Sequence, residues 1–146
     1  MLRIIASAFA MLVSASSVYA ERIEVEMLNI NADGDRMVFS QELIEASIGD
    51  EIVFVPTDKG HNAQSVQGAI PEGQASFRGA MNQEVTYTVT EAGLTAVVCL
   101  PHQSMGMVAV IVVDGNTDNA DSVLAARVPG RGGQKIQELV EQAQSM

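Results

Sequence analysis

Residues 95–113 read TAVVCLPHQSMGMVAVIVV, and two apolar runs, Thr95–Cys99 and Val108–Val113, flank a short segment that contains proline, histidine and glycine. Both runs are rich in β-branched side chains, so each predicts a β-strand. Alternating patterns and shorter apolar runs predict further strands at residues 23–27, 37–39, 44–48, 52–55 and 85–89. Because strands of this kind recur about every ten residues, we expect an all-β fold, a small sandwich or barrel.

Two regions depart from this pattern. Residues 62–78 are polar, contain glycine and proline and show no sustained period, which predicts a long loop with one short helical turn. Residues 118–128 and 134–143 carry apolar side chains at helical spacing, and Pro129-Gly130-Arg131-Gly132-Gly133 separates them. Each helix is too short to be stable alone, so we expect both to cover an edge or face of a sheet.

The N-terminus has the pattern of a secretory signal peptide, residues 1–20. Arg3 precedes an apolar stretch from Ile4 to Val13, and Val18-Tyr19-Ala20 forms a small-residue cleavage site. The apolar stretch is shorter than the ~20 residues that span a bilayer, so no membrane insertion of the mature chain is expected. The sequence thus predicts export to the periplasm or beyond, with residues 21–146 forming a single domain.

Charge and cysteine content exclude several classes of protein. The predicted mature chain keeps 7 basic and 18 acidic side chains, a formal charge of −11, and has no basic run. Nucleic-acid binding is excluded because phosphate neutralisation needs clustered Lys and Arg. With one cysteine, the chain has no intramolecular disulfide and no four-cysteine zinc or iron–sulfur site.

One group of side chains has the chemistry of a metal site. Cys99, His102, Met105 and Met107 lie within nine residues, and the only other histidine, His61, follows a predicted strand. A thiolate, two imidazoles and a weak thioether are the ligands of a blue-copper electron-transfer site. Zinc is the main competitor, but thioether is a poor zinc ligand, which favours copper.

Several motifs resemble those of the pseudoazurin family of cupredoxins. They are Asp58-Lys59-Gly60-His61-Asn62, Ile70-Pro71-Glu72-Gly73 and Cys99-x-Pro101-His102-x₂-Met105-Gly106-Met107. The similarity extends over essentially the whole predicted mature chain. It implies a Greek-key β-sandwich of eight strands with two short C-terminal α-helices. It also implies one type 1 copper and single-electron shuttling between periplasmic redox proteins, such as copper nitrite reductase and c-type cytochromes, by a monomer.

The resemblance also assigns roles to residues. It implies that His61, Cys99 and His102 are equatorial copper ligands and that Met107, rather than Met105, is the axial one. Asn62 would tie the His61 loop to the Cys99 loop, with its backbone N–H donating to the thiolate. Pro101 has no N–H to donate to sulfur, which favours Cu(II).

The family resemblance further implies an exposed edge of His102 within an apolar ring of Met37, Pro56, Gly60, Met105 and Pro101. Pseudoazurins commonly surround this histidine with lysines, but here Lys59 and Arg78 are the only basic residues between Arg36 and Arg127. Positions where relatives often carry lysine are uncharged: Gln67, Ser76, Ala80 and Val98. We therefore expect docking that is mainly apolar or that favours a basic partner such as a c-type cytochrome.

Two other functions fit the composition less well. A periplasmic copper chaperone or storage protein would use the methionines, yet no Met-rich repeat remains after Met1 and Met11 leave with the signal peptide. A copper enzyme is disfavoured because four protein ligands leave no open position for substrate. An electron carrier, not an enzyme, is therefore the expected function.

Overall fold

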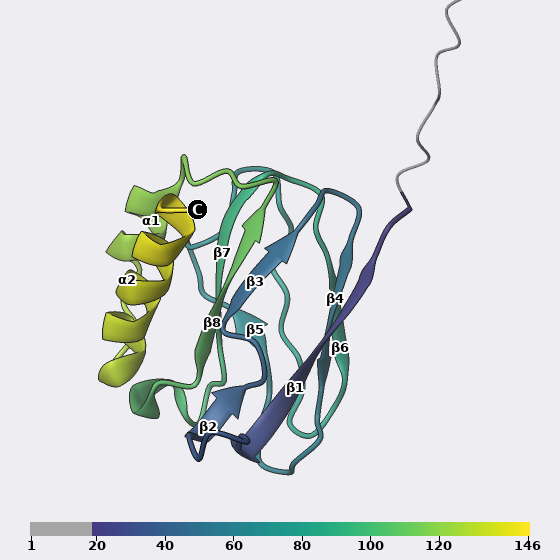
Figure 1. Ribbon diagram of the computed structural model, residues 1–146, viewed down its shortest axis with the longest axis vertical. Coiled ribbons are helices and arrows are strands. Elements are labelled where there is room, and N and C mark those ends of the chain that lie inside the picture. Colours follow the sequence, from purple (N-terminus) through teal and green to yellow (C-terminus); the bar gives the residue numbers. More distant parts are fainter. Residues whose placement is uncertain (1–18) are drawn as a thin grey trace, which may run out of the picture.

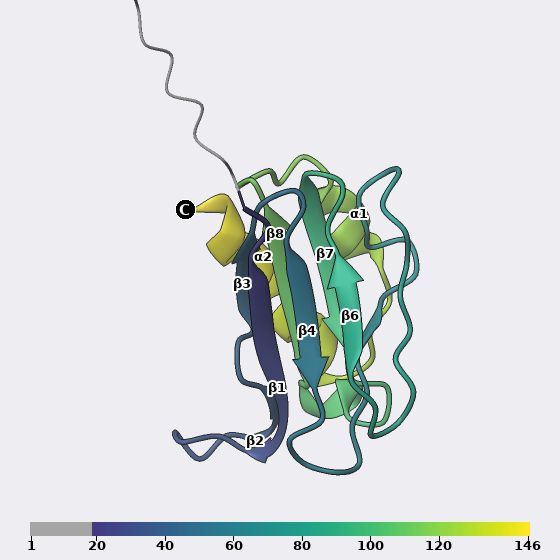
Figure 2. The same cartoon turned by 90° about the vertical axis from the view of Figure 1, so that its right-hand side faces the viewer.

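The computed structural model describes residues 19–146, so the predicted signal peptide of residues 1–20 lies outside the described part except for its last two residues. Within that part, eight strands form two four-stranded sheets that face each other (Figures 1 and 2). The first sheet has the order β2-β1-β4-β6, with β2 (Arg36–Phe39), β1 (Arg22–Ile30), β4 (Glu51–Val55) and β6 (Val85–Thr88). The second has the order β3-β8-β7-β5, with β3 (Leu43–Ala46), β8 (Val108–Val113), β7 (Gly93–Val98) and β5 (Gln64–Ser65).

Strand pairing is mostly antiparallel. Two pairs are parallel, β1 with β4 and β3 with β8, and in the first of these Val25 lies opposite Phe54. The hairpin of β7 and β8 pairs Gly93 with Val113 and Val98 with Val108, so it opens into the loop that carries the predicted ligands. The expected β-sandwich of eight strands with two C-terminal helices is confirmed.

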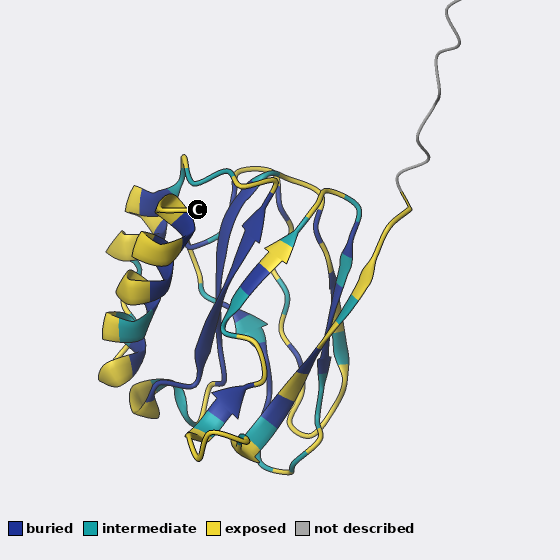
Figure 3. Ribbon diagram, in the orientation of Figure 1, coloured by how far each residue is buried: buried dark blue, intermediate teal, exposed yellow. Residues whose placement is uncertain are grey.

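Strands β7 and β8 are buried along their whole length (Figure 3). Val97 and Ile111 point into the core between the sheets, whereas Ala96 and Val110 belong to a second core beneath the helices. Helices α1 (Ala120–Ala125) and α2 (Arg131–Gln144) cover that outer face, as Figure 1 shows. A strand covered on both faces favours apolar side chains at nearly every position, which explains the almost continuous apolar runs in the sequence.

The covering helices begin and end differently from the prediction. Helix α2 includes Arg131, Gly132 and Gly133, which were expected to break the helix. The reason is packing: an added Cβ at Gly132 would overlap the carbonyl oxygen of Gln103 in the neighbouring 3₁₀ turn η1 (Gln103–Met105). Glycine therefore allows the first turn of α2 to approach η1 closely, and the backbone stays helical.

The long polar segment also differs from expectation. It contains strand β5, and the short helical turn predicted within residues 62–78 is wrong. Its backbone is held instead by bonds across the segment, since Ser65 N–H donates to Phe77 O (3.0 Å) and Phe77 N–H donates to Ser65 Oγ (3.0 Å). These bonds join residues 12 positions apart, which a local sequence pattern does not reveal.

Candidate metal centre

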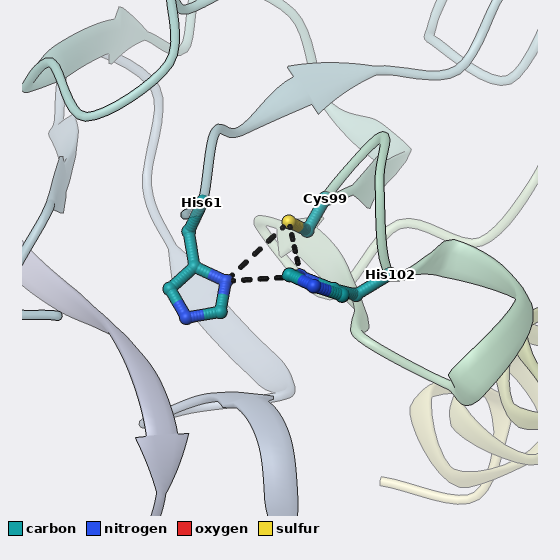
Figure 4. Close-up of side chains that lie close together, drawn as sticks. All are labelled: His61, Cys99 and His102. Carbon is teal, nitrogen blue, oxygen red and sulfur yellow. Dashed lines mark hydrogen bonds between the residues drawn. The ribbon is translucent and has the colours of Figure 1, made fainter. Parts of the chain in front are cut away.

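His61, Cys99 and His102 meet at one end of the sandwich. His61 lies in the loop between β4 and β5, and its side chain is fully buried. Cys99 directly follows β7 and is also buried, whereas His102, just before η1, is half-buried. The two strands that end here belong to different sheets, so the sandwich itself brings the three side chains together (Figure 4).

The donor atoms of these residues converge on one point. The Nδ1 atoms of His61 and His102 are 3.2 Å apart, and Cys99 Sγ lies 3.7 Å from the first and 3.5 Å from the second. The donor atoms of the three residues all lie within 4.8 Å of one another. Two nitrogens and a sulfur gathered this closely match the trigonal His₂Cys set of a blue-copper site.

The ring of His61 is held in the tautomer that a metal needs. Its Nε2 lies 2.9 Å from Asn29 Oδ1. An amide oxygen only accepts hydrogen bonds, so Nε2 carries the proton and the lone pair of Nδ1 points into the cluster. Asn29 was missed as a functional residue because it lies in β1, 32 residues upstream of His61.

Electrostatics favour the uncharged forms of two of these side chains. Burial lowers the pKa of His61, the neighbouring His102 lowers it further, and Asp58 opposes both effects. Burial raises the pKa of the Cys99 thiol, while hydrogen bonds from the backbone amides of Asn62 and His102 act in the opposite direction. Metal binding therefore displaces a thiol proton but meets a His61 imidazole that is already neutral.

Asn62 joins the two ligand-bearing loops, as expected. In addition to its backbone amide, its side chain takes part: Oδ1 accepts the Leu100 N–H at 2.8 Å, and Nδ2 donates to Gly79 O at 3.1 Å. A second asparagine, Asn82, braces the loop that carries His61. Its Oδ1 accepts the Gly60 N–H, and its backbone N–H donates to His61 O at 2.9 Å. Asn82 was not among the expected site residues.

The two candidate methionines lie in different environments. Met107 is fully buried in the same core cluster as Cys99, and its carbonyl oxygen accepts the Cys99 N–H at 3.0 Å. Its own N–H donates to His102 O at 3.2 Å, so its backbone is hydrogen-bonded to both Cys99 and His102. Met105 is 48% exposed and belongs to the surface.

The surface at this end is more apolar than expected. Leu100 and Met105, on either side of His102, and Met81, next to Asn82, are large apolar side chains with more than two fifths of their surface exposed. Leu100 and Met81 were not in the predicted ring. Val98 was among the positions where relatives often carry a surface lysine. Here its side chain is 3% exposed, so it does not belong to a docking surface.

Comparison with known proteins gives a consistent result. A family model described as copper binding proteins, plastocyanin/azurin family, matches residues 25–114. The pseudoazurin of Paracoccus pantotrophus is 40% identical over 131 residues, covering 90% of each chain. A solved pseudoazurin from Sinorhizobium has 38% identity and a TM-score of 0.81 over 86% of this chain and 98% of that chain. The pseudoazurin of Hyphomicrobium denitrificans has 34% identity and a TM-score of 0.77 over 83% and 97%.

Family membership also bears on chemistry and location. Pseudoazurins bind copper, carry electrons rather than act as enzymes, and are generally periplasmic. Within residues 19–146, no helix is long and apolar enough to cross a membrane. The site and the comparisons lead to one conclusion: this chain belongs to the pseudoazurin family of cupredoxins and is a type 1 copper electron-transfer protein.

Proposed function

We propose that residues 21–146 form a single-domain, monomeric carrier in the periplasm, with copper held by His61, Cys99, His102 and Met107. The convergence of two Nδ1 atoms and one Sγ within 4.8 Å is the observation that supports the site most strongly. Copper would supply a one-electron Cu(II)/Cu(I) couple there. A His₂Cys set suits both oxidation states, so little rearrangement accompanies electron transfer.

The buried position of Met107 supports its role as the axial ligand. An axial thioether in a blue-copper site is a long, weak ligand. Met107 is closed off from solvent and bonded through its backbone to Cys99 and His102. The exposed side chain of Met105 suits contact with a partner instead.

The electron would leave through His102, the only half-buried member of the cluster. Exposed Leu100 and Met105 flank it in the chain, and an apolar surface permits brief contacts without costly desolvation of charges. Short-lived redox complexes use small interfaces of this kind.

The hollow beside this surface is lined by charges of both signs. Arg36, Arg131 and Lys135 line a hollow between β2, η1 and α2, but Asp35 and Glu138 line it too. Lys135 also forms an ion pair with Glu42. This mixture of basic and acidic side chains supports docking that is mainly apolar or that favours a basic partner such as a c-type cytochrome. Copper nitrite reductase is the alternative acceptor.

Salt dependence tests the choice of partner. Electrostatic attraction is screened over ~8 Å at physiological ionic strength. With an acidic nitrite reductase, we expect the electron-transfer rate to stay constant or rise as salt is added, because the two proteins repel each other at long range. A steep fall would show that a working basic face exists.

Stopped-flow reduction and reoxidation test the carrier function itself. The copper-loaded protein is expected to be blue, to lose its colour on reduction and to regain it rapidly with c-type cytochromes or nitrite reductase as acceptors. A colourless complex that holds only Cu(I) and does not cycle would instead support the chaperone or storage function.

A further inference from the structure

Asp50 is a buried carboxylate in the turn between β3 and β4, away from His61, Cys99 and His102. It is 6% exposed, and both of its oxygens accept bonds from the backbone. Oδ2 accepts the Ser47 N–H at 2.8 Å, and Oδ1 accepts the Glu21 N–H at 2.7 Å. The carboxylate therefore joins the start of the described fold to the β3–β4 turn.

No side-chain cation neutralises this carboxylate in residues 19–146. The ion pairs found there join Arg22 to Glu24 and to Glu84, and Lys135 to Glu42. A buried carboxylate is rare without a cationic partner, because removing the charge from water is costly. The two main-chain donors at Asp50 are uncharged, so they satisfy its oxygens with hydrogen bonds but do not balance its charge.

The regular structure begins directly after Glu21, whose N–H donates to Asp50. Glu21 O accepts the Glu51 N–H at 2.8 Å, and β1 starts at Arg22. Tyr19, two residues earlier, is 86% exposed. The predicted cleavage between Ala20 and Glu21 thus coincides with the point at which the chain joins the fold.

We propose that Asp50 is the acceptor for the α-ammonium group that a signal peptidase creates at Glu21. Hydrolysis of the Ala20–Glu21 bond consumes one water and leaves a carboxylate on Ala20 and an amino group on Glu21. This amino group is protonated at neutral pH. The nitrogen 2.7 Å from Asp50 Oδ1 then changes from a neutral amide to a cation, so an ion pair replaces a hydrogen bond from an uncharged donor.

The contact stabilises more than the first strand. The Asp50 carbonyl accepts the Val89 N–H at 3.0 Å, and its N–H donates to Ser47 O at 3.0 Å. One residue therefore connects the N-terminus, the β3–β4 turn and the segment after β6. The inference rests on the proposed removal of residues 1–20 and is independent of copper binding.

A double-mutant cycle tests the proposal. All described strands and helices lie within residues 22–144, so a chain that begins at Glu21 retains them. Copper-loaded chains beginning at Glu21 or at Ala20 are compared, each with the native Asp50 and with the substitution Asp50→Asn. The Glu21 chain is expected to melt about 3–6 °C higher than the Ala20 chain, and Asp50→Asn should abolish this difference. Equal melting temperatures with Asp50 in place, or a difference that persists after Asp50→Asn, would overturn the proposal.

N-terminal acetylation of the Glu21 chain provides a variant that leaves Asp50 intact. It keeps the N–H donor and removes the charge, so the chain should melt like the Ala20 chain; an unchanged melting temperature would refute the ammonium contact. Mass spectrometry of the exported full-length protein should find Glu21 at the N-terminus. Another N-terminus would overturn the processing step, whereas a failed cycle would overturn only the role of Asp50 and leave the carrier function standing.

Discussion

Gly132 offers a direct way to perturb the copper centre from outside its ligands. It lies in the first turn of α2 and packs against the ligand loop, which we define as residues 99–107. An added Cβ would overlap the Gln103 carbonyl oxygen and lie 2.8 Å from Val128 Cγ1. That carbonyl belongs to the residue after His102 and accepts the Gly106 N–H at 3.1 Å. Displacing it disturbs the turn that orients His102.

The size of the effect follows from two opposing terms. Alanine is favoured over glycine within a helix by up to about 1 kcal/mol. Overpacking costs about 1–3 kcal/mol, and the upper end applies because the overlapped atom is backbone and cannot rotate away. For Gly132→Ala we expect a net loss of about 2 kcal/mol, which lowers the melting temperature by roughly 6–8 °C. Copper affinity should fall about tenfold, as for other residues that orient metal ligands.

Gly133→Ala is the matched control. Its Cβ would lie 2.6 Å from Val128 O, so it strains the same helical turn, but it meets no atom of the ligand loop within 4 Å. Thermal unfolding, copper titration and the visible spectrum are measured for both variants. Only Gly132→Ala should change the spectrum and the affinity. Equal changes in both, or none in Gly132→Ala, would refute the coupling between α2 and the ligand loop.

Two further changes test individual hydrogen bonds. Asn29→Leu removes the acceptor for the His61 Nε2–H and should lower copper affinity about tenfold in a competition titration; unchanged affinity would show that Asn29 does not orient the ring. Tyr87→Phe removes the buried bond to Thr95 (3.2 Å) and should cost about 1 kcal/mol at neutral pH. Burial raises the pKa of Tyr87 above its ordinary value of 10.0, so folding favours the protonated ring and stability falls as pH rises beyond 10. Melting curves should show a smaller alkaline loss for Tyr87→Phe, and parallel pH profiles would contradict this.

Local patterns were sufficient to predict seven of the eight described strands and the residues that cluster at the candidate metal centre. The runs that became β7 and β8 are apolar at nearly every position, because helices cover one face and the facing sheet covers the other. The Cys99–Met107 loop concentrates soft donors within nine residues, and His61 is the only other histidine. The sequence therefore offers few candidates for the ligands of a His₂Cys site.

Features that depend on contacts between distant residues could not be predicted. Asn29 in β1 contacts the ring of His61, and Asn82 braces the loop that carries His61 through Gly60, 22 positions away. Gly132 has the local signature of a helix breaker, yet the carbonyl oxygen of Gln103 determines why glycine is needed there. In each case the partner lies far away in the sequence, and only the fold brings the two together.

We propose that Cys99 is the thiolate ligand of a type 1 copper in this chain. The most direct test adds Cu(II) to the metal-free wild-type protein and to Cys99→Ser and records the visible and electron paramagnetic resonance spectra. We predict an intense blue species in the wild-type protein and its complete loss in Cys99→Ser, while the β-sheet circular dichroism remains, because the sandwich core comes from the strands. A wild-type protein that stays colourless with Cu(II), or a serine variant that stays blue, would contradict the assignment.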